Sequence, residues 1–314
     1  MKKLMIGLMA ATALGTAFPA LAQSNEIAVI VKTANSNFWQ NVNKGAEAAV
    51  KDLPDYTMTF QGPVAESNVA DQVNMVDNAV NRHVAGIVLA PSDPDALIPS
   101  IKKAWENAIP VVLIDSGISD SGKDYYQSFL STDNKAAGEL CAQEMIDRMG
   151  DSGKIAIMSY VAGVGSEIGR VGGFTDYIKA NSDIEIVNTF YSQAQMATAL
   201  NQTIDALAAY PDLDGIFGAN EPTAAGMGRA IEQAGKAGQL TAIGFDGNED
   251  LQNFVRDGTL QGIAVQGSFQ MGELGVQTVA KVLAGESVEK FIDTGVVFVT
   301  EENIDQPEAQ NVLY

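Results

Sequence analysis

Short apolar runs alternate along the chain with longer stretches in which apolar residues recur every three or four positions. The short runs are rich in Val, Ile and Leu, which is typical of strands buried on both faces of a sheet. They lie at residues 27–31, 86–90, 111–114, 154–160, 215–218, 241–245 and 262–265. The longer stretches, with the period of amphipathic helices, lie at residues 38–52, 69–81, 96–107, 136–149, 170–181, 197–209, 224–234 and 272–283. The alternation predicts βαβ units and an α/β fold whose parallel sheets are covered on both faces.

The same plan occurs twice along the chain. Three strands of the first half are followed, 128, 129 and 130 residues later, by three strands of the second half. The residues that open these strands are Ile27 and Ile155, Gly86 and Gly215, and Val111 and Thr241. The repeat predicts two lobes of the same α/β topology. Because no segment rich in Pro, Gly and Ser separates the halves, we expect several short crossings between the lobes.

The first 22 residues have the layout of a secretory signal peptide. Lys2 and Lys3 give a positive start, an apolar stretch runs over residues 4–14, and residues 20–22 (Ala-Leu-Ala) supply the small residues of a cleavage site. A membrane anchor is the alternative, but the apolar part is short for a hydrocarbon core of ~30 Å. We expect cleavage after Ala22 and export to the periplasm.

The chain is strongly acidic. Its formal net charge is −20, which becomes −22 without the two lysines of the signal peptide. Such a surface repels phosphate backbones and anionic lipids, so nucleic acid and membrane surfaces are poor candidates for partners. The one cysteine, Cys141, lies in an amphipathic run rich in Ala and Gly, which favours a buried structural thiol.

Polar and aromatic side chains follow the predicted strands. In an open parallel sheet, ligands bind at the carboxyl ends of the strands. In the first half the candidates are Lys32, Asn35, Ser36, Asn37, Phe38, Trp39, Asp115 and Ser116. In the second half they are Ser166, Glu167, Arg170, Asn220, Phe245, Asp246 and Gln266. Carboxylates, amides, a few cations and aromatic faces suit a small polyhydroxylated solute, because each hydroxyl both donates and accepts while the C–H patches are apolar.

Each candidate also has a purely structural interpretation. Residues 35–37 could cap a helix, and Asp115 and Asp246 could form turns. The aromatic pair 38–39 could pack in the core, and Arg170 could form a salt bridge between helices. The matched placement of Asp115 and Asp246, one in each half, favours ligand binding and predicts a cleft with one acid from each lobe.

The groups that enzymes commonly use are scarce. His83 is the only histidine, so a Ser-His-Asp triad lacks its central member, and no Cys/His cluster could hold zinc. The glycine-rich segment 163–169 departs from the spacing of a dinucleotide-binding loop. The acidic pairs 93/95 and 212/214 lack the pattern of a calcium loop. We therefore expect no enzymatic activity, no cofactor and no metal site.

In their order and spacing, these segments resemble one known family, the ribose-type periplasmic sugar-binding proteins of bacterial ABC importers (type I periplasmic binding proteins). The matching stretches are residues 27–31 and 35–39, Pro110 to Asp115, Gly173-Phe174, Gly218 to Glu221, Gly244 to Gly247, and Gln266. The resemblance covers nearly all of the chain after residue 22. It implies two Rossmann-like, doubly wound parallel-sheet lobes joined by a three-strand hinge. The implied lobes are residues 23–131 plus 267–292 (N-terminal) and 132–266 plus 293–314 (C-terminal).

The resemblance also implies roles for single residues. Phe38 and Trp39 would stack on one face of a sugar, and Phe245 on the other. The residues implied to bind hydroxyls are Asp115, Asn220, Asp246 and Gln266.

Three positions depart from the ribose binder. Ser116 stands where that protein has an arginine, Lys32 stands where it has a serine, and the binding arginine of the fourth-strand loop falls near Ile168, two places before Arg170. These departures favour a small polyol other than ribose. Lys32 and residues 61–66 also resemble the rhamnose- and autoinducer-binding branch of the superfamily.

The expected function is that of the solute-binding component of an ABC transporter, a monomer that captures a monosaccharide or sugar alcohol and delivers it to the permease subunits. One alternative is a periplasmic sensory receptor for a sugar-like or furanosyl autoinducer ligand, with a chemoreceptor as its partner. An intracellular repressor shares such lobes but needs a basic helix-turn-helix where this chain has its signal peptide.

Overall fold

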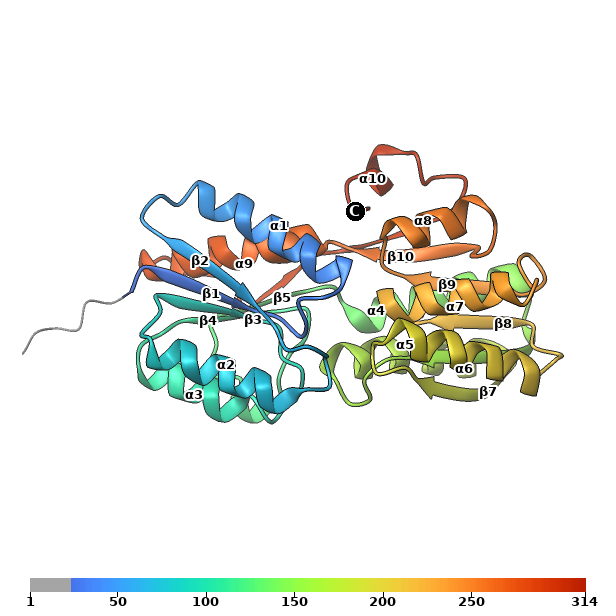
Figure 1. Ribbon diagram of the computed structural model, residues 1–314, viewed down its shortest axis with the longest axis horizontal. Coiled ribbons are helices and arrows are strands. Elements are labelled where there is room, and N and C mark those ends of the chain that lie inside the picture. Colours follow the sequence, from blue (N-terminus) through green and yellow to red (C-terminus); the bar gives the residue numbers. More distant parts are fainter. Residues whose placement is uncertain (1–23) are drawn as a thin grey trace, which may run out of the picture.

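The computed structural model describes residues 24–314, so the predicted signal peptide lies outside the described residues. The chain forms two lobes side by side (Figure 1), each built on a six-stranded sheet. The first sheet has the order β11-β5-β4-β3-β1-β2, with β1 (Glu26–Ile30), β2 (Thr57–Gln61), β3 (Gly86–Leu89), β4 (Val111–Ile114), β5 (Ser128–Ser131) and β11 (Phe291–Asp293). The second has the order β12-β10-β9-β8-β6-β7, with β6 (Ser152–Ser159), β7 (Asp183–Tyr191), β8 (Gly215–Gly218), β9 (Thr241–Phe245), β10 (Gly262–Gln266) and β12 (Val296–Val299). Equivalent strands occupy equivalent places, which confirms the predicted pair of α/β lobes.

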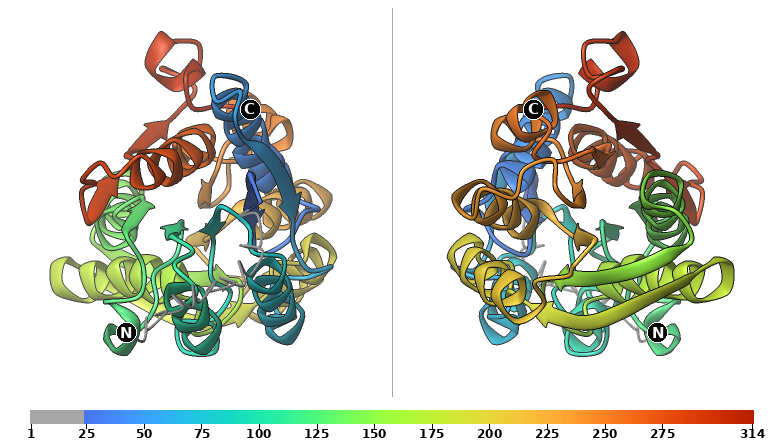
Figure 2. Two further views of the ribbon diagram at one scale, coloured as in Figure 1. Left: turned by 90° about the vertical axis from the view of Figure 1, so that its left-hand side faces the viewer. Right: turned by 90° about the vertical axis from the view of Figure 1, so that its right-hand side faces the viewer.

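Helices cover both faces of each sheet (Figures 1 and 2). In the N-terminal lobe, α1 (Asn37–Lys51) and α9 (Ser268–Leu283) cover one face, and α2 (Val69–Asn81) and α3 (Ile98–Glu106) cover the other. In the C-terminal lobe, α4 (Asn134–Met149) and α5 (Gly165–Asn181) cover one face, and α6 (Met196–Ala209), α7 (Glu221–Gln233) and α8 (Glu249–Arg256) cover the other. No helix within residues 24–314 is long and apolar enough to cross a membrane.

The strands in the middle of each sheet are largely apolar because their side chains alternate between two cores. In β1, Ile27 and Val29 pack in the cluster beneath α1 and α9, whereas Ala28 and Ile30 pack in the cluster beneath α2 and α3. Successive side chains of a strand point to opposite faces, so a strand between two helical layers must be apolar at every position. This explains the unbroken apolar runs of the sequence.

Glycines allow one pair of helices in each lobe to approach closely. A Cβ at Gly138 in α4 would lie 2.0 Å from the carbonyl oxygen of Arg170 in α5. In the N-terminal lobe, a Cβ at Gly45 or Gly272 would lie 1.9 Å from a carbonyl oxygen of the facing helix. Any larger residue at these positions would push the helices apart. The contact at Gly138 lets α4 pack closely against α5 at the backbone of Arg170.

The lobes are joined by three short segments that lie together. The chain crosses after β5, after β10, and between β11 and β12. The N–H of Thr294 donates to the carbonyl of Ser131 at 3.1 Å, and the Thr132 hydroxyl donates to the carbonyl of Gly295 at 2.9 Å. Three parallel connections restrict the lobes to a hinge motion rather than free rotation. The lobe boundaries at residues 131, 266 and 292 stay predictions.

Five strands lack a signal in the hydrophobic pattern. Four of them, β2, β7, β11 and β12, lie at sheet edges, and β2 and β7 carry a mixture of exposed and half-buried side chains. β5 is a four-residue strand that begins and ends in serine. β12 pairs antiparallel with β10, unlike the parallel pairs elsewhere in both sheets. α8 and the short α10 (Pro307–Gln310) were not predicted either, and α5 begins at Gly165, five residues before the predicted start.

The apolar interior of the C-terminal lobe contains Cys141. Its side chain is fully buried in α4, and burial raises the pKa of its thiol. A buried neutral thiol behaves as a small apolar group. The structure therefore confirms the predicted structural role.

Candidate ligand-binding site

A small cavity lies between the two lobes, at the carboxyl ends of the parallel strands. The N-terminal lobe contributes Lys32, Ser36, Phe38, Trp39, Glu66 and Asp115 to its wall. The C-terminal lobe contributes Tyr160, Ser166, Arg170, Asn220, Glu221, Pro222, Asp246 and Gln266. Ten of these fourteen residues are among those predicted from the sequence. A cavity between two lobes with several convergent polar groups is typical of a site for a small ligand.

Asp115 and Asp246 occupy equivalent positions in the wall, directly after β4 and β9. Their backbones adopt φ values of 61° and 76°, in the left-handed region, which Asp tolerates better than most residues. Both side chains are buried. The structure thus places one acid from each lobe at the cavity, where the matched strands predict them.

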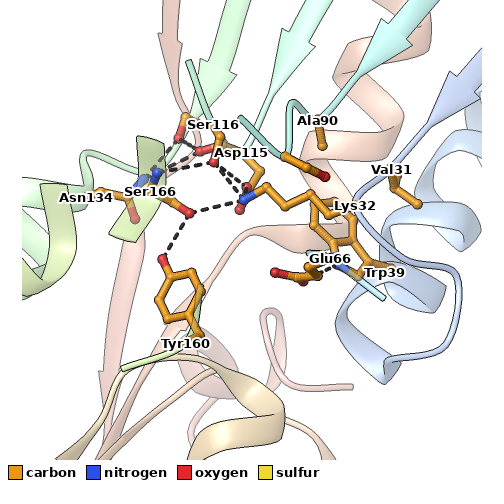
Figure 3. A network of polar contacts seen from close by, with 12 residues as sticks. Val31, Lys32, Trp39, Glu66, Ala90, Asp115, Ser116, Asn134, Tyr160 and Ser166 are labelled. Atoms are coloured by element: carbon orange, nitrogen blue, oxygen red, sulfur yellow. Dashed lines mark hydrogen bonds and ion pairs between the residues drawn. The ribbon is translucent and has the colours of Figure 1, made fainter. Parts of the chain in front are cut away.

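Lys32 connects the two lobes through its ammonium group (Figure 3). Its Nζ lies 2.5 Å from Asp115 Oδ2 and donates to Ser116 Oγ at 2.7 Å and to Ser166 Oγ, in the other lobe, at 3.1 Å. Ser166 Oγ also accepts from the Tyr160 hydroxyl at 2.9 Å. An ammonium has three donors, and all three have partners here. The buried charge of Lys32 is therefore both paired and fully hydrogen-bonded.

Arg170 is the second buried cation. Its guanidinium donates to Asn134 Oδ1 at 2.7 Å, to the Ala219 carbonyl at 2.7 Å and to Gln266 Oε1 at 3.1 Å. It also lies 3.6 Å from the centroid of the Phe245 ring, a cation–π contact. Phe245 is completely buried under this guanidinium and does not line the cavity. The implied stacking of Phe245 on a sugar is therefore not available in this arrangement, because Arg170 lies on the ring.

Phe38 and Trp39 form an aromatic corner of the cavity. Their rings are T-shaped, with centroids 4.8 Å apart. Trp39 Nε1 donates to Glu66 Oε1 at 3.1 Å (Figure 3). Glu66 is buried, and this burial raises the pKa of its carboxyl, although the charge of Lys32 and the Trp39 hydrogen bond act in the opposite direction. The corner therefore combines apolar ring faces with a carboxyl group.

Two further acids, Asp246 and Glu221, lie together in the C-terminal lobe. Asp246 accepts hydrogen bonds from Gln266 Nε2 at 2.8 Å and from the backbone N–H of Glu221 at 2.9 Å. Burial raises the pKa of Asp246 to about 6, although Arg170 and both hydrogen bonds favour the carboxylate. Burial and the charge of Asp246 raise the pKa of Glu221 to about 7. Both acids therefore change their protonation near neutral pH.

Five predicted residues lie outside the cavity wall: Asn35, Asn37, Ser116, Glu167 and Phe245. The amide of Asn35 donates to the Val64 carbonyl at the surface, and Ser116 binds Lys32. Glu167 accepts from the Ser159 hydroxyl at 3.0 Å and from the N–H of Gly163 at 3.1 Å. These hydrogen bonds give Ser116 and Glu167 positioning roles around the wall. The Glu167 carboxylate also occupies the glycine-rich loop, where a nucleotide phosphate would need the free N–H group.

Four residues of the wall are not among the fifteen predicted binding residues: Glu66, Tyr160, Glu221 and Pro222. Glu66 follows β2, an edge strand that has no continuous apolar run. Tyr160 is the last residue of the predicted run 154–160, so its strand-end position could have identified it. Glu221 follows Asn220 at a strand end and closes the family-like stretch Gly218 to Glu221, although no binding role was predicted for it. Nothing in the local pattern marks Pro222. Among residues 24–314, no group of three or more His, Cys, Asp or Glu side chains is placed to hold a metal ion.

Residues 27–287 match the protein family described as the periplasmic binding protein domain. The chain belongs to this family. A crystal structure of an ABC transporter solute-binding protein from Agrobacterium vitis with bound D-fucose is 72% identical to this periplasmic binding protein; the match covers 92% of this chain and 100% of that chain, with a TM-score of 0.92. A solute-binding protein from Agrobacterium radiobacter in complex with D-arabinose is 32% identical, covering 94% and 100% of the two chains, with a TM-score of 0.88. The D-allose-binding periplasmic protein of Escherichia coli is 30% identical over 278 residues, 87% of each chain.

These matches confirm the predicted fold and class. The chain has the two-lobed fold of type I periplasmic binding proteins, and the relatives and solved structures that it matches include sugar-binding proteins and solute-binding proteins of ABC transporters. Family membership places it in the periplasm. The family is one of transport proteins rather than enzymes.

Proposed function

We propose that this periplasmic binding protein captures D-fucose, or an aldopyranose of closely similar shape, in the cavity between its lobes and delivers it to the permease subunits of an ABC importer. The observation that carries the proposal is the 72% identity to the D-fucose-bound protein over that protein's full length. The proposal includes two further points: the mature protein begins after Ala22, and it acts as a monomer.

The free hydrogen-bonding groups of the wall support a polyhydroxylated ligand. Asp115 Oδ2 is engaged by Lys32 and Ser116, which leaves Oδ1 for a ligand hydroxyl. Glu66 Oε1 accepts from Trp39, which leaves Oε2, and Asn220 Oδ1 accepts from the N–H of Thr223, which leaves the amide NH₂. Two acceptors from one lobe and a donor from the other suit hydroxyl groups on opposite edges of a sugar ring.

The aromatic corner supports a sugar with an apolar edge. Phe38 and Trp39 present ring faces and edges to the cavity without a charged group of their own. A deoxysugar carries a methyl group where other hexoses carry a hydroxymethyl group, and an aromatic wall favours the methyl group because no hydroxyl has to lose its water. This favours D-fucose over its hydroxylated counterpart D-galactose.

Isothermal titration of the mature protein with D-fucose, D-galactose, D-arabinose, D-allose and D-ribose tests the proposal. We expect D-fucose to bind most tightly, with a Kd on the order of 1 μM or below. Asp115→Asn should weaken D-fucose binding at least tenfold, whereas Asp93→Asn, a carboxylate outside the cavity, should leave it unchanged. Tighter binding of another sugar of the panel would reject D-fucose as the ligand while keeping a sugar role.

A further inference from the structure

Glu221 crosses from the C-terminal lobe to the backbone of the N-terminal lobe. The N–H of Asn37 donates to its Oε1 at 3.3 Å, and the N–H of Phe38 donates to its Oε2. Asn37 and Phe38 are the first two residues of α1, whose start faces the C-terminal lobe (Figure 1). A side chain of one lobe therefore accepts hydrogen bonds from the start of a helix in the other.

The first N–H groups of a helix have no acceptor within the helix. In α1, Ser36 in the same lobe accepts the N–H of Trp39 at 3.3 Å, but those of Asn37 and Phe38 find their acceptor only in Glu221. A carboxylate at this end of a helix also interacts favourably with the helix dipole. Separating the lobes would leave both N–H groups to water, so this cap exists only in the closed arrangement.

Tyr314 reinforces the same contact. Its hydroxyl donates to Glu221 Oε2 at 3.2 Å. Its backbone is fixed to the C-terminal lobe, because its N–H donates to the Gly247 carbonyl at 3.1 Å and its carbonyl accepts from Gln252 at 3.3 Å. Its ring packs against the apolar cluster of the N-terminal lobe that contains Phe38. Figures 1 and 2 show this end of the chain beside α1. Tyr314 thus touches both lobes and covers the Glu221 carboxylate.

Both oxygens of Glu221 are engaged by the protein itself. This distinguishes Glu221 from Asp115 and Glu66, each of which keeps one oxygen without a partner among residues 24–314. Glu221 lines the cavity, yet both of its carboxylate oxygens already accept hydrogen bonds from the protein, including two backbone N–H groups of the opposite lobe. The charged group facing it is the carboxylate of Asp246, at the end of β9.

From this geometry we infer that Glu221 is a positioning residue that holds the closed lobes together, acting as a cap on α1 across the cavity and slowing the release of the bound sugar. The inference depends on the closed arrangement of the two lobes and not on which sugar the cavity holds. Its effect falls on the lifetime of the closed form, since the hydrogen bonds form only after the lobes meet.

Two measurements on Glu221→Ala test this role. In stopped-flow experiments with D-fucose, the release rate should rise about three- to thirtyfold, the range for loss of a helix cap, while the association rate stays the same. In hydrogen-exchange NMR of the D-fucose complex, the amides of Asn37 and Phe38 should exchange faster in the variant than in the unaltered protein.

Asp93→Ala is the matched control. Asp93 Oδ1 accepts two backbone N–H groups, those of Asp95 at 2.9 Å and Ala96 at 2.7 Å, within one lobe. Its replacement should speed exchange at those two amides and leave sugar release unchanged. Unchanged exchange at Asn37 and Phe38 in Glu221→Ala, or an equal change of release rate in both variants, would overturn the inference. If D-fucose does not bind, the proposed ligand fails, and the same two measurements with whichever sugar of the titration panel binds decide the role of Glu221.

Discussion

Asp115 and Asp246 stand at equivalent strand ends of the two lobes, yet the charges around them differ. Asp115 has the ammonium group of Lys32 at 2.5 Å. Asp246 has amide and backbone donors, with the Arg170 guanidinium as a more distant favourable charge, and its pKa is raised to about 6. The shared topology fixes where the acids lie, whereas the neighbouring side chains decide how each is stabilised. The N-terminal acid is part of an ion pair, and the C-terminal acid responds to pH.

Of the substitutions considered, Lys32→Met should have the largest effect, because it removes the ion pair that distinguishes Asp115 from Asp246. Its partner Asp115 would remain buried without a counter-charge, which costs about 3–5 kcal/mol, and the contact with Ser166 across the lobes would be lost. We expect the free energy of unfolding, measured by urea denaturation, to fall by this amount. Adding Asp115→Asn should restore most of the stability but not the sugar binding, since the acid also faces the cavity.

The exposed pair of Lys154 and Asp212 is the control for this experiment. Its atoms are 2.6 Å apart, close to the distance in the buried pair, but the two side chains are 39% and 63% exposed. Lys154→Met should leave the free energy of unfolding nearly unchanged, because water screens an exposed pair. Equal losses in Lys32→Met and Lys154→Met would contradict the assignment of Asp115 as a charge that depends on its partner.

Sugar affinity measured at several pH values tests the acids of the C-terminal lobe. Glu221, which faces Asp246 and Tyr314, has a pKa of about 7 in the closed arrangement, against an ordinary value of 4.5. Opening would admit water and return this pKa toward 4.5, so the closed form binds a proton more tightly than the open form. Closure is therefore favoured as the pH falls through 7, and D-fucose affinity should rise up to about tenfold between pH 8 and pH 6.

Titration calorimetry in the two buffers measures this change. In Glu221→Gln the slope should shrink to the part that Asp246, with its pKa of about 6, contributes. Affinity that falls as the pH falls from 8 to 6 would show that the ionised form of Glu221 stabilises closure more than its burial opposes it.

The contrast between the acids also shows how far the sequence can predict the site. Asp115 and Asp246 were predicted because continuous apolar runs locate the ends of buried strands. Glu66 was missed because β2 is an edge strand with a mixed pattern. The position of Phe245 was predicted, but its partner was not: a ring at a strand end can face a ligand or another side chain, and only the packing of α5 brings Arg170 over it. Periodicity thus gives the topology and the strand ends, while contacts between distant elements decide which side chains face the cavity.

Glu66 provides the smallest expected effect. Burial raises the pKa of its carboxyl, and one oxygen accepts from Trp39. Glu66→Gln keeps both the shape and this acceptor, so D-fucose affinity should change less than about threefold. Glu66→Ala should lose about 1–3 kcal/mol of stability, because Trp39 Nε1 would be buried without a partner. If calorimetry gives equally large losses of affinity for Gln and Ala, Glu66 acts through its negative charge and belongs with Asp115. If only Ala is costly, the aromatic corner needs an acceptor rather than a charge, and Asp115 is the acid of this lobe whose ionisation the site requires.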